Sequence, residues 1–165
     1  MMDKRLNFFE IEGAYITYLQ NIDKRVPKVD YSAVGLHDKF LCGIVLKVNE
    51  YDYFAPISSF KISQRTNIII KDDNGKDVAS IRFSFMIPVP SDVVSLKRIA
   101  DEVSPQYRML LNMELRFCRR NASAIYSRAR FVYDAATVKK DPLMLINCCD
   151  FKSLEAASAE YLRDA

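Results

Sequence analysis

The sequence predicts an α+β fold in which a small antiparallel sheet or barrel carries helices on one side. Three observations support this prediction. Alternating patterns typical of strands crowd residues 1–90, and patterns with the helical period follow in residues 91–165. A chain of 165 residues that is 50% hydrophobic has enough apolar material for one core. Because no linker, repeat or low-complexity segment interrupts it, we expect one domain over residues 1–165.

A strand, a short helix and a long loop are expected near the N-terminal end. Residues 6–11 have a strand pattern, and apolar residues recur at the helical spacing over 14–19, after Gly13. The pattern breaks from Asn21 to Asp38, where proline, glycine and aspartate interrupt it. A loop of this length is a candidate for function.

Two hairpins should build the sheet. Phe40–Val48 and Tyr51–Ile57 are rich in β-branched and aromatic residues and lie two residues apart, which predicts a hairpin with a central, buried first strand. Asn67–Lys71 and Val78–Phe83 flank Asn74-Gly75, a pair that supplies the positive φ angles of a tight turn. The second hairpin follows from that turn chemistry.

The chain is expected to change from strands to helices after Ile87–Pro90. Each proline of this segment removes a ladder donor, so the segment can lie only at a sheet edge or exit. Ser91 is expected to cap a helix over 92–101, because acidic residues follow it in the first turn. Ser104 and Pro105 are expected to open a second helix, with proline at its first position.

The second helix is expected to be long, and a last helix should follow Asp150. Asp150 can cap this last helix, which should reach Tyr161 and Leu162. The buried face of the long helix steps by three or four positions: Tyr107, Leu111, Leu115, Cys118, Ala122, Ile125, Ala129 and Val132.

Charge and cysteine content exclude several classes of protein. The 24 basic and 21 acidic residues give a net charge of +3, which does not by itself indicate a nucleic-acid binder. The four cysteines show no metal-ligand spacing, and no phosphate-binding glycine motif occurs, so the sequence predicts no cofactor and no metal.

Without a signal-peptide pattern or an apolar run of roughly 18 residues, a soluble, cytoplasmic protein with reduced thiols is expected.

The segment Ala55–Lys61 gathers two hydroxyls and an ammonium within four residues. Ser58, Ser59 and Lys61 follow a predicted strand, where a rigid scaffold displays functional groups. Such donors can neutralise the charge that builds on a phosphate during phosphodiester cleavage. The alternative is a solvated loop in which a serine caps a turn and Lys61 points to water.

The preceding loop adds three groups that can move a proton or hold a phosphate: Tyr31, His37 and Lys39. Because His37 is the only histidine, an arrangement of two catalytic imidazoles is unavailable. A solvated, structural role is the alternative for each of these residues.

A basic stretch lies between Val103 and Tyr133, with Glu114 as the only glutamate among many arginines. Arginine binds phosphate backbones and stacks on unpaired bases, so a ridge of this kind can form an RNA-binding surface. An ordinary solvated helix face is the alternative. The arginines expected on the ridge are Arg108, Arg116, Arg119 and Arg130, and Arg120 lies next to them.

Short motifs that run in order along most of the chain resemble the ToxN/AbiQ family, the endoribonuclease toxins of type III toxin-antitoxin systems. The match extends from about Tyr15 to Tyr161. The motifs are Tyr15-Ile16-x-Tyr18-Leu19, Val26-Pro27, Lys39-Phe40-x-x-Gly43-Ile44-Val45-Leu46, Tyr53-x-Ala55-Pro56-x-x-Ser59-x-Lys61, Phe85-Met86-Ile87-Pro88 and Cys149-x-Phe151-x-x-Leu154-Glu155.

The resemblance implies an SH3-like antiparallel barrel, similar to MazF/Kid toxins, elaborated by helices. It implies a metal-independent endoribonuclease that cuts single-stranded RNA and leaves a 2′,3′-cyclic phosphate and a 5′-hydroxyl. The implied partner is a small repeated RNA antitoxin, folded as pseudoknots, which the toxin processes and which encloses it in a closed RNA-protein assembly. Growth arrest and abortive infection of phage-infected cells are the implied consequences.

The resemblance also assigns residues. The family's loop serine and lysine fall on Ser59 and Lys61, its preceding hydroxyl residue on Ser58, and its lysine before the first long strand on Lys39. Tyr31 is the tyrosine available for the family's functional tyrosine. We therefore expect these five residues to be catalytic. The expected RNA-binding set is Lys39, Ser59, Lys61, Arg65, Arg116, Arg119 and Arg120.

Two other functions stay open from the sequence alone. A non-catalytic RNA-binding or protein-binding module would use Ser58, Ser59 and Lys61 merely to contact phosphate. A barrel-type toxin that poisons a protein target would arrest growth without cutting RNA.

Overall fold

The computed structural model describes residues 5–28 and 40–164, with side chains as far as Leu162. Tyr31, His37 and Lys39 therefore lie outside the described residues. The strands are β1 (Asn7–Ile11), β2 (Leu41–Val48), β3 (Tyr51–Ser58), β4 (Asn67–Lys71), β5 (Asp77–Arg82), β6 (Ile87–Pro88) and β7 (Val94–Leu96). The helices are α1 (Gly13–Ile22), α2 (Pro105–Arg120), α3 (Ala122–Thr137), α4 (Pro142–Asn147) and α5 (Phe151–Asp164), with 3-10 turns η1 (Phe83–Phe85), η2 (Ser91–Val93) and η3 (Ile99–Asp101).

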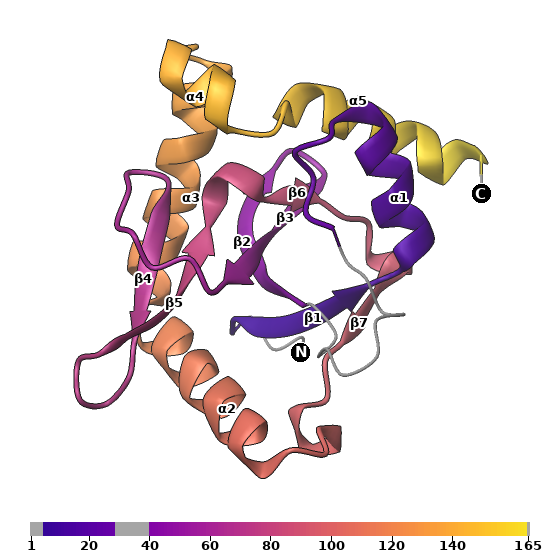
Figure 1. The fold of residues 1–165 in the computed structure, drawn as a ribbon. Helices are drawn as coiled ribbons and strands as arrows, with labels where there is room; N and C mark the ends of the chain where they lie inside the picture. Colours follow the sequence, from indigo (N-terminus) through magenta and orange to yellow (C-terminus); the bar gives the residue numbers. More distant parts are fainter. Residues whose placement is uncertain (1–4, 29–39, 165) are drawn as a thin grey trace.

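The strands form one antiparallel sheet with the order β4-β5-β3-β2-β1-β7, and β6 pairs with β3 beside this path. The helices pack around it: α3 lies behind β4 and β5, α2 lies below them in contact with β4, and α1 and α5 lie side by side at the other end (Figure 1). The α+β class is thus confirmed. The SH3-like barrel is not confirmed, because the described sheet ends at β4 and β7 and does not close.

Both predicted hairpins are present. In the first, Asn49 has φ 54° at the turn, and β2 lies between β1 and β3, as expected for a central strand. In the second, Gly75 has φ 81°, and the Asp72 carboxylate accepts hydrogen bonds from the backbone of Asn74 and Lys76. The prediction that Ile87–Pro90 lies at an edge is also confirmed, because Ile87 and Pro88 pair with β3 beside the main strand order and Val89 adds one backbone hydrogen bond to Asp52.

The helix expected over residues 92–101 is wrong. Ser91 opens only the 3-10 turn η2, and Val94–Leu96 then pairs with β1 as strand β7. The strand extends the sheet edge, where Lys97 donates its backbone N–H to the carbonyl of Phe8. Lys97 is buried and pairs with Glu102 at 2.8 Å, so tertiary pairing overrides the local helix signal.

The single long helix is wrong as well, because the chain breaks at Asn121 into α2 and α3. Asn121 has φ −110° and ψ 23°, and its side-chain amide donates to the Phe117 carbonyl at 2.8 Å. A side chain that competes in this way for backbone groups favours a helix end. The predicted start is confirmed, since Ser104 accepts a hydrogen bond from the backbone of Tyr107. The predicted apolar stripe is buried through Leu111, Cys118, Ile125, Ala129 and Val132.

A buried carboxylate joins the sheet to two helices. Glu155 of α5 accepts hydrogen bonds at Oε2 from the hydroxyls of Tyr53 on β3, at 2.5 Å, and of Tyr133 on α3, at 2.7 Å. Lys152 lies 3.5 Å from the other oxygen, so the charge is compensated. Burial and the contact with Glu155 raise the pKa of Tyr53 far above its ordinary value. The phenol therefore stays protonated and keeps donating.

No helix in the described ranges is long and apolar enough to cross a membrane.

The Glu155 network predicts a specific loss of stability. Tyr53→Phe removes one donor from a buried carboxylate, so the free energy of unfolding should fall by about 1 to 3 kcal/mol in urea titrations. Tyr126→Phe is the matched control: Tyr126 is partly exposed and its hydroxyl has no hydrogen bond within the described residues, so its effect should stay within about 0.5 kcal/mol. Equal effects of the two changes would contradict the role assigned to Glu155.

Glu114 makes stability depend on pH. Its carboxyl is 4% exposed on α2, and burial raises its pKa from 4.5 to about 7. Between these two values the folded state keeps a proton that the unfolded state releases. The contribution of Glu114 to the free energy of unfolding is therefore fully present below about pH 4.5 and is lost as pH rises through about 7. Glu114→Gln should thus gain about 2 to 3 kcal/mol relative to the parent between pH 5 and pH 8. Parallel stability curves of the two proteins would refute the shift.

Candidate functional site

The loop over residues 59–66 leaves the sheet at the end of β3. Ser58 is the last residue of β3, and its Oγ accepts a hydrogen bond of 3.1 Å from the backbone N–H of Phe60. Because this bond uses the oxygen as acceptor, the hydroxyl proton of Ser58 is left to donate elsewhere. Ser59 and Lys61 are exposed on the same loop. The structure therefore places the three sequence-predicted groups together just past a strand.

Two buried side chains pin the backbone of this loop. Ser80 of β5 donates from its hydroxyl to the Phe60 carbonyl at 2.6 Å. Asn67 of β4 donates from its amide to the Ile62 carbonyl and accepts from the Gln64 backbone N–H, both at 2.9 Å. Asn67 is 2% exposed and Ser80 is fully buried. Lys61 is thus held between two residues whose carbonyls are fixed.

Helix α3 braces the loop from another side. Arg128 donates from Nη1 to the Asn67 carbonyl at 2.7 Å and, at 3.4 Å, to the carbonyls of Gln64 and Arg65. The guanidinium of Arg65 lies 5.4 Å from the centre of the Phe131 ring. The loop is therefore attached to both a strand and a helix, although it has no regular structure of its own.

Arg82, the last residue of β5, lies beneath the loop. Its Cζ is 4.3 Å from the centre of the Phe60 ring and 4.6 Å from that of Phe85. Burial lowers the pKa of this guanidinium, because part of its hydration is lost. Within residues 5–28 and 40–164, these ring contacts are its only described interactions, and no carboxylate or carbonyl pairs with it.

Three adjoining hollows surround the loop, and we call them together the loop groove. The first, of about 370 Å³, is lined by Ser58, Ser59 and the segment that follows α1. The second, of about 250 Å³, shares Arg82 and Phe85 with the first and reaches α4. The third shares Gln64 and Arg65 with the second and ends against α3. The hollows therefore adjoin one another, with shared walls, near the end of β3.

Among the described residues, the loop groove is lined by cations and by no acidic side chain. No aspartate or glutamate of residues 5–28 and 40–164 lines the three hollows, although the chain has 21 acidic residues against 24 basic ones. A surface of this kind raises the local positive potential and favours a polyanion such as a phosphodiester chain. The cations that line it are Arg25, Lys28, Arg65, Arg82 and Arg128.

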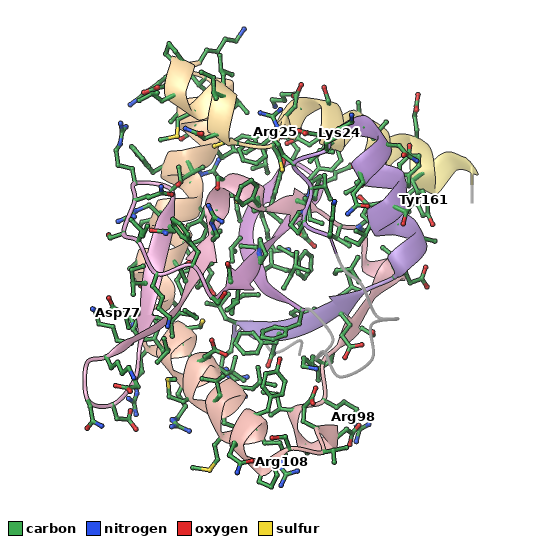
Figure 2. All side chains as sticks on the ribbon, in the orientation of Figure 1. Lys24, Arg25, Asp77, Arg98, Arg108 and Tyr161 are labelled. Atoms are coloured by element: carbon green, nitrogen blue, oxygen red, sulfur yellow. The ribbon has the colours of Figure 1, made fainter. Side chains whose placement is uncertain are left out.

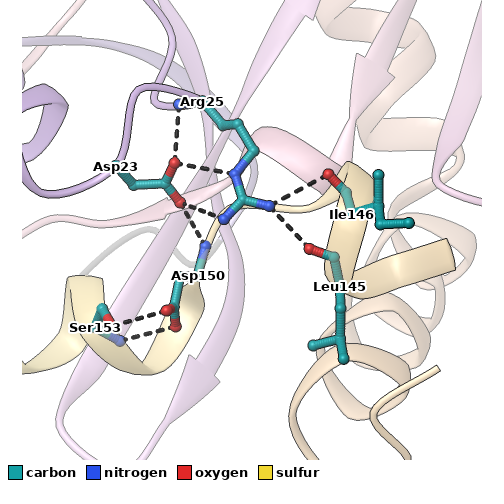
Figure 3. Close-up of polar contacts among 6 residues, drawn as sticks. All are labelled: Asp23, Arg25, Leu145, Ile146, Asp150 and Ser153. Atoms are coloured by element: carbon teal, nitrogen blue, oxygen red, sulfur yellow. Dashed lines mark hydrogen bonds and ion pairs between the residues drawn. The ribbon is translucent and has the colours of Figure 1, made fainter. Parts of the chain in front are cut away.

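A compact set of hydrogen bonds fixes Arg25 at the wall of the groove (Figure 3). Its Nε and Nη2 donate to the Asp23 carboxylate at 3.0 Å, while Nη1 donates to the carbonyls of Leu145 and Ile146 in α4. The Asp150 backbone N–H also donates to Asp23, at 2.7 Å. Burial alone would raise the pKa of Asp23, but the bonds from Arg25 and Asp150 lower it below its usual value. The groove wall is thus tied to α4 and to the start of α5.

The arginines of the expected RNA-binding ridge are divided between α2 and α3, because the helix expected to carry them is interrupted at Asn121. Arg119 is half-buried against β1, where it donates to the Leu6 carbonyl and to the Asn7 side chain. Arg116 is exposed, and its nearest described carboxylate is that of Asp73, at 4.0 Å. Two other arginines of the basic stretch bond to backbone carbonyls: Arg108 donates to that of Glu102 and Arg130 to that of Lys47. Arg120 is exposed.

Several residues that shape the loop groove or support its loop were not predicted from the sequence. Arg82 had one recognisable signal, since a cation between Ile81 and Phe83 is unusual in a strand of a buried sheet. Asn67 and Ser80 had none, because polar residues near strand ends are common. Of the expected RNA-binding residues, Ser59 and Arg65 line the groove, and Lys61 is exposed close to it.

Known proteins match this chain over nearly its whole length. Residues 7–159 match the family model described as "Toxin ToxN, type III toxin-antitoxin system". An endoribonuclease ToxN of Bacillus thuringiensis subsp. kurstaki is 28% identical over 93% of this chain and 83% of its own length. An endoribonuclease AbiQ of Lactococcus lactis subsp. lactis is 29% identical over 94% of this chain and 89% of its own length.

The fold agrees with this match. A solved structure from work on selective toxin inhibition by a non-coding RNA pseudoknot superposes with a TM-score of 0.85 and 28% identity, covering 95% of this chain and 98% of its own. The similarity thus extends over nearly the whole fold. The chain belongs to the ToxN family of type III toxin-antitoxin systems.

Proposed function

We propose that this chain is an endoribonuclease toxin of a type III toxin-antitoxin system. It cuts single-stranded RNA, is inhibited by a small repeated RNA that folds as a pseudoknot, and processes that RNA. Its relatives carry the names of endoribonucleases. The observation that carries the proposal is the loop groove, which is lined by Arg25, Lys28, Arg65, Arg82 and Arg128 and passes Ser58 and Ser59 at the end of β3.

The proposed reaction is attack of a ribose 2′-oxygen on the neighbouring phosphorus. The P–O5′ bond breaks, which leaves a 2′,3′-cyclic phosphate and a 5′-hydroxyl; the 2′-hydroxyl loses a proton and the 5′-oxygen gains one. Ser58 and Ser59 would donate hydrogen bonds to the phosphate oxygens, because the Ser58 hydroxyl proton is not used within the loop. Lys61 would stabilise the charge that develops on those oxygens.

The remaining step is proton transfer, for which Tyr31 and Lys39 are the proposed groups. Lys61 is assigned to charge stabilisation, because a positioned ammonium can neutralise the charge that develops on the phosphate oxygens. The chemistry proposed here needs no metal, since the loop supplies hydroxyls and an ammonium for the phosphate charge.

The pinned loop supports a catalytic function rather than mere binding. Hydrogen-bond donors stabilise a transition state most when they are already in position, because no reorganisation is then required during the reaction. The bonds from Ser80, Asn67 and Arg128 to the loop backbone hold it in this way. A loop that only contacted phosphate would not need three buried or half-buried side chains for its support.

The substrate RNA is proposed to follow the loop groove. Arg65, which the sequence analysis assigned to RNA binding, lines two of the hollows. Arg116 and Arg120 are exposed on α2 and are proposed as a second contact for the longer antitoxin RNA. Arg119 is not proposed as an RNA contact, because its guanidinium already donates to the Leu6 carbonyl and the Asn7 side chain. A closed assembly of toxins and antitoxin RNAs would use both contacts.

Lys61→Ala should abolish most of the cleavage. A positioned electrostatic donor contributes about 3 to 4 kcal/mol to a barrier, so the single-turnover rate should fall at least about 100-fold while folding is unchanged. The measurement uses a transcript of the antitoxin repeats in EDTA, with mapping of the product ends. Lys76→Ala, an exposed lysine in the β4–β5 turn, is the matched control and should cut normally. Parent-like cutting by Lys61→Ala would remove Lys61 from the mechanism.

Asn67→Ala should slow cleavage by releasing the loop. The change leaves the Ile62 carbonyl and the Gln64 N–H without partners, so the rate at saturating protein should fall about 10- to 100-fold, as expected for misplaced reactive groups. RNA affinity should change much less. Asn74→Ala in the exposed turn is the control. If affinity and rate fell together by the same factor, the loop would be a binding element only.

The same assays decide between this proposal and its alternatives. A binding module would hold the RNA without cutting it and would not arrest growth when expressed. A toxin that acts on a protein would arrest growth with the RNA intact. An active endoribonuclease would arrest growth with cut RNA, and co-expression of the antitoxin RNA would relieve the arrest.

A further inference from the structure

Arg82 is the charged side chain that the first and second hollows of the loop groove share. A strand of RNA that passes from the Ser58 side to the Arg65 side must cross it. We infer that Arg82 binds an RNA phosphate adjacent to the scissile one and so sets the register of the substrate in the groove. This inference rests on the proposed function, because the phosphate in question belongs to the RNA that would be cut.

The surroundings of Arg82 leave its hydrogen-bonding capacity unused. A guanidinium has five N–H donors, and a charged group that is partly withdrawn from water needs acceptors. Within the described parts of the chain, Phe60 and Phe85 contact it, and neither ring offers a carboxylate or carbonyl oxygen. Of the residues that the structure describes, no acidic side chain lines either hollow. The missing acceptor would be supplied by an anion from outside.

A phosphate suits this position better than another acceptor does. The planar fork of arginine matches two oxygens of one phosphate and forms shorter, stronger bonds with them than with a neutral group. The two aromatic rings restrict the guanidinium, so less side-chain entropy is lost when the anion binds. Ser58 and Ser59, in the first hollow, would hold the scissile phosphate beside it.

The ring contact also connects Arg82 to the catalytic loop. Phe60 stands between Ser59 and Lys61 in the sequence, and its carbonyl is fixed by Ser80. The Arg82 guanidinium lies 4.3 Å from the centre of the Phe60 ring. A phosphate held by Arg82 would therefore be placed relative to the same residue that positions Ser59 and Lys61.

The test compares Arg82→Met and Arg82→Lys with the parent protein. The probe is an RNA with a single 2′-deoxy substitution at the cut site, which binds without being cut, and its dissociation constant is measured by fluorescence anisotropy over a range of salt. Arg82→Met should weaken binding about tenfold or more and lower the slope of log K against log salt by about 0.7, the value for one phosphate on a single strand. Arg82→Lys should keep the slope and lose part of the affinity.

Arg98→Met is the matched control, because it removes the same charge from a site outside the groove. Arg98 is exposed beside Asp101, and it lies at the opposite end of the molecule from Arg25 (Figure 2). The affinity of the Arg98→Met variant for the RNA probe and the salt slope of that affinity should equal those of the parent. Equal slopes and affinities for Arg82→Met and Arg98→Met would overturn the inference.

A second measurement follows the parent protein itself and does not depend on RNA cleavage. The Nε–Hε signals of the arginines of the parent protein are followed by NMR while inorganic phosphate is added, with Arg82→Lys used for assignment. The Arg82 signal should shift with a saturating curve, and the Arg98 signal should not; an Arg82 signal that does not respond would refute the site. A response without any RNA cutting would refute the proposed function and leave an anion site at Arg82.

Discussion

The buried carboxylate of Glu155 holds the architecture on which the site depends. It is the common acceptor for the hydroxyls of Tyr53 and Tyr133, so it fixes α5 and α3 against β3 at one point. β3 ends at Ser58, and α3 carries the arginine that braces the following loop. Because the strand that leads into the loop and the helix that braces it both bond to Glu155, the stability of the core and the position of the reactive groups are coupled.

A loop that displays reactive groups must still satisfy its own backbone. In this protein the partners come from side chains of β4, β5 and α3 rather than from a neighbouring strand. The arrangement keeps Ser59 and Lys61 exposed while the carbonyls beside them are fixed. It also brings Arg82 under the loop, between two phenylalanine rings. Support of the loop and the positive charge of the groove are therefore provided by the same few elements.

The sequence predicted the features that local chemistry determines. The turn at Gly75 and the cap at Ser104 follow from the conformation or hydrogen bonds of a few adjacent residues, and both are present. The break at Asn121 and the strand at Val94–Leu96 depend on partners far along the chain, so periodicity predicted helices there instead. Proximity in sequence placed Ser58, Ser59 and Lys61 together. The cations of the groove come from four separate segments of the chain, which no local pattern can bring together: Arg25 and Lys28, then Arg65, then Arg82, and then Arg128.

The side chain of Asn67 donates a hydrogen bond to one carbonyl of the loop, that of Ile62, and accepts one from a backbone N–H of the same loop, that of Gln64. Aspartate has the shape but lacks the donor, and leucine has neither group. Position 67 is therefore restricted in residue type for reasons unrelated to RNA contact. A genetic selection for harmless variants would recover changes at this buried position beside changes at the exposed residues of the loop. The two groups would look alike in such a selection, and they would separate only when affinity for RNA is measured on the purified variants.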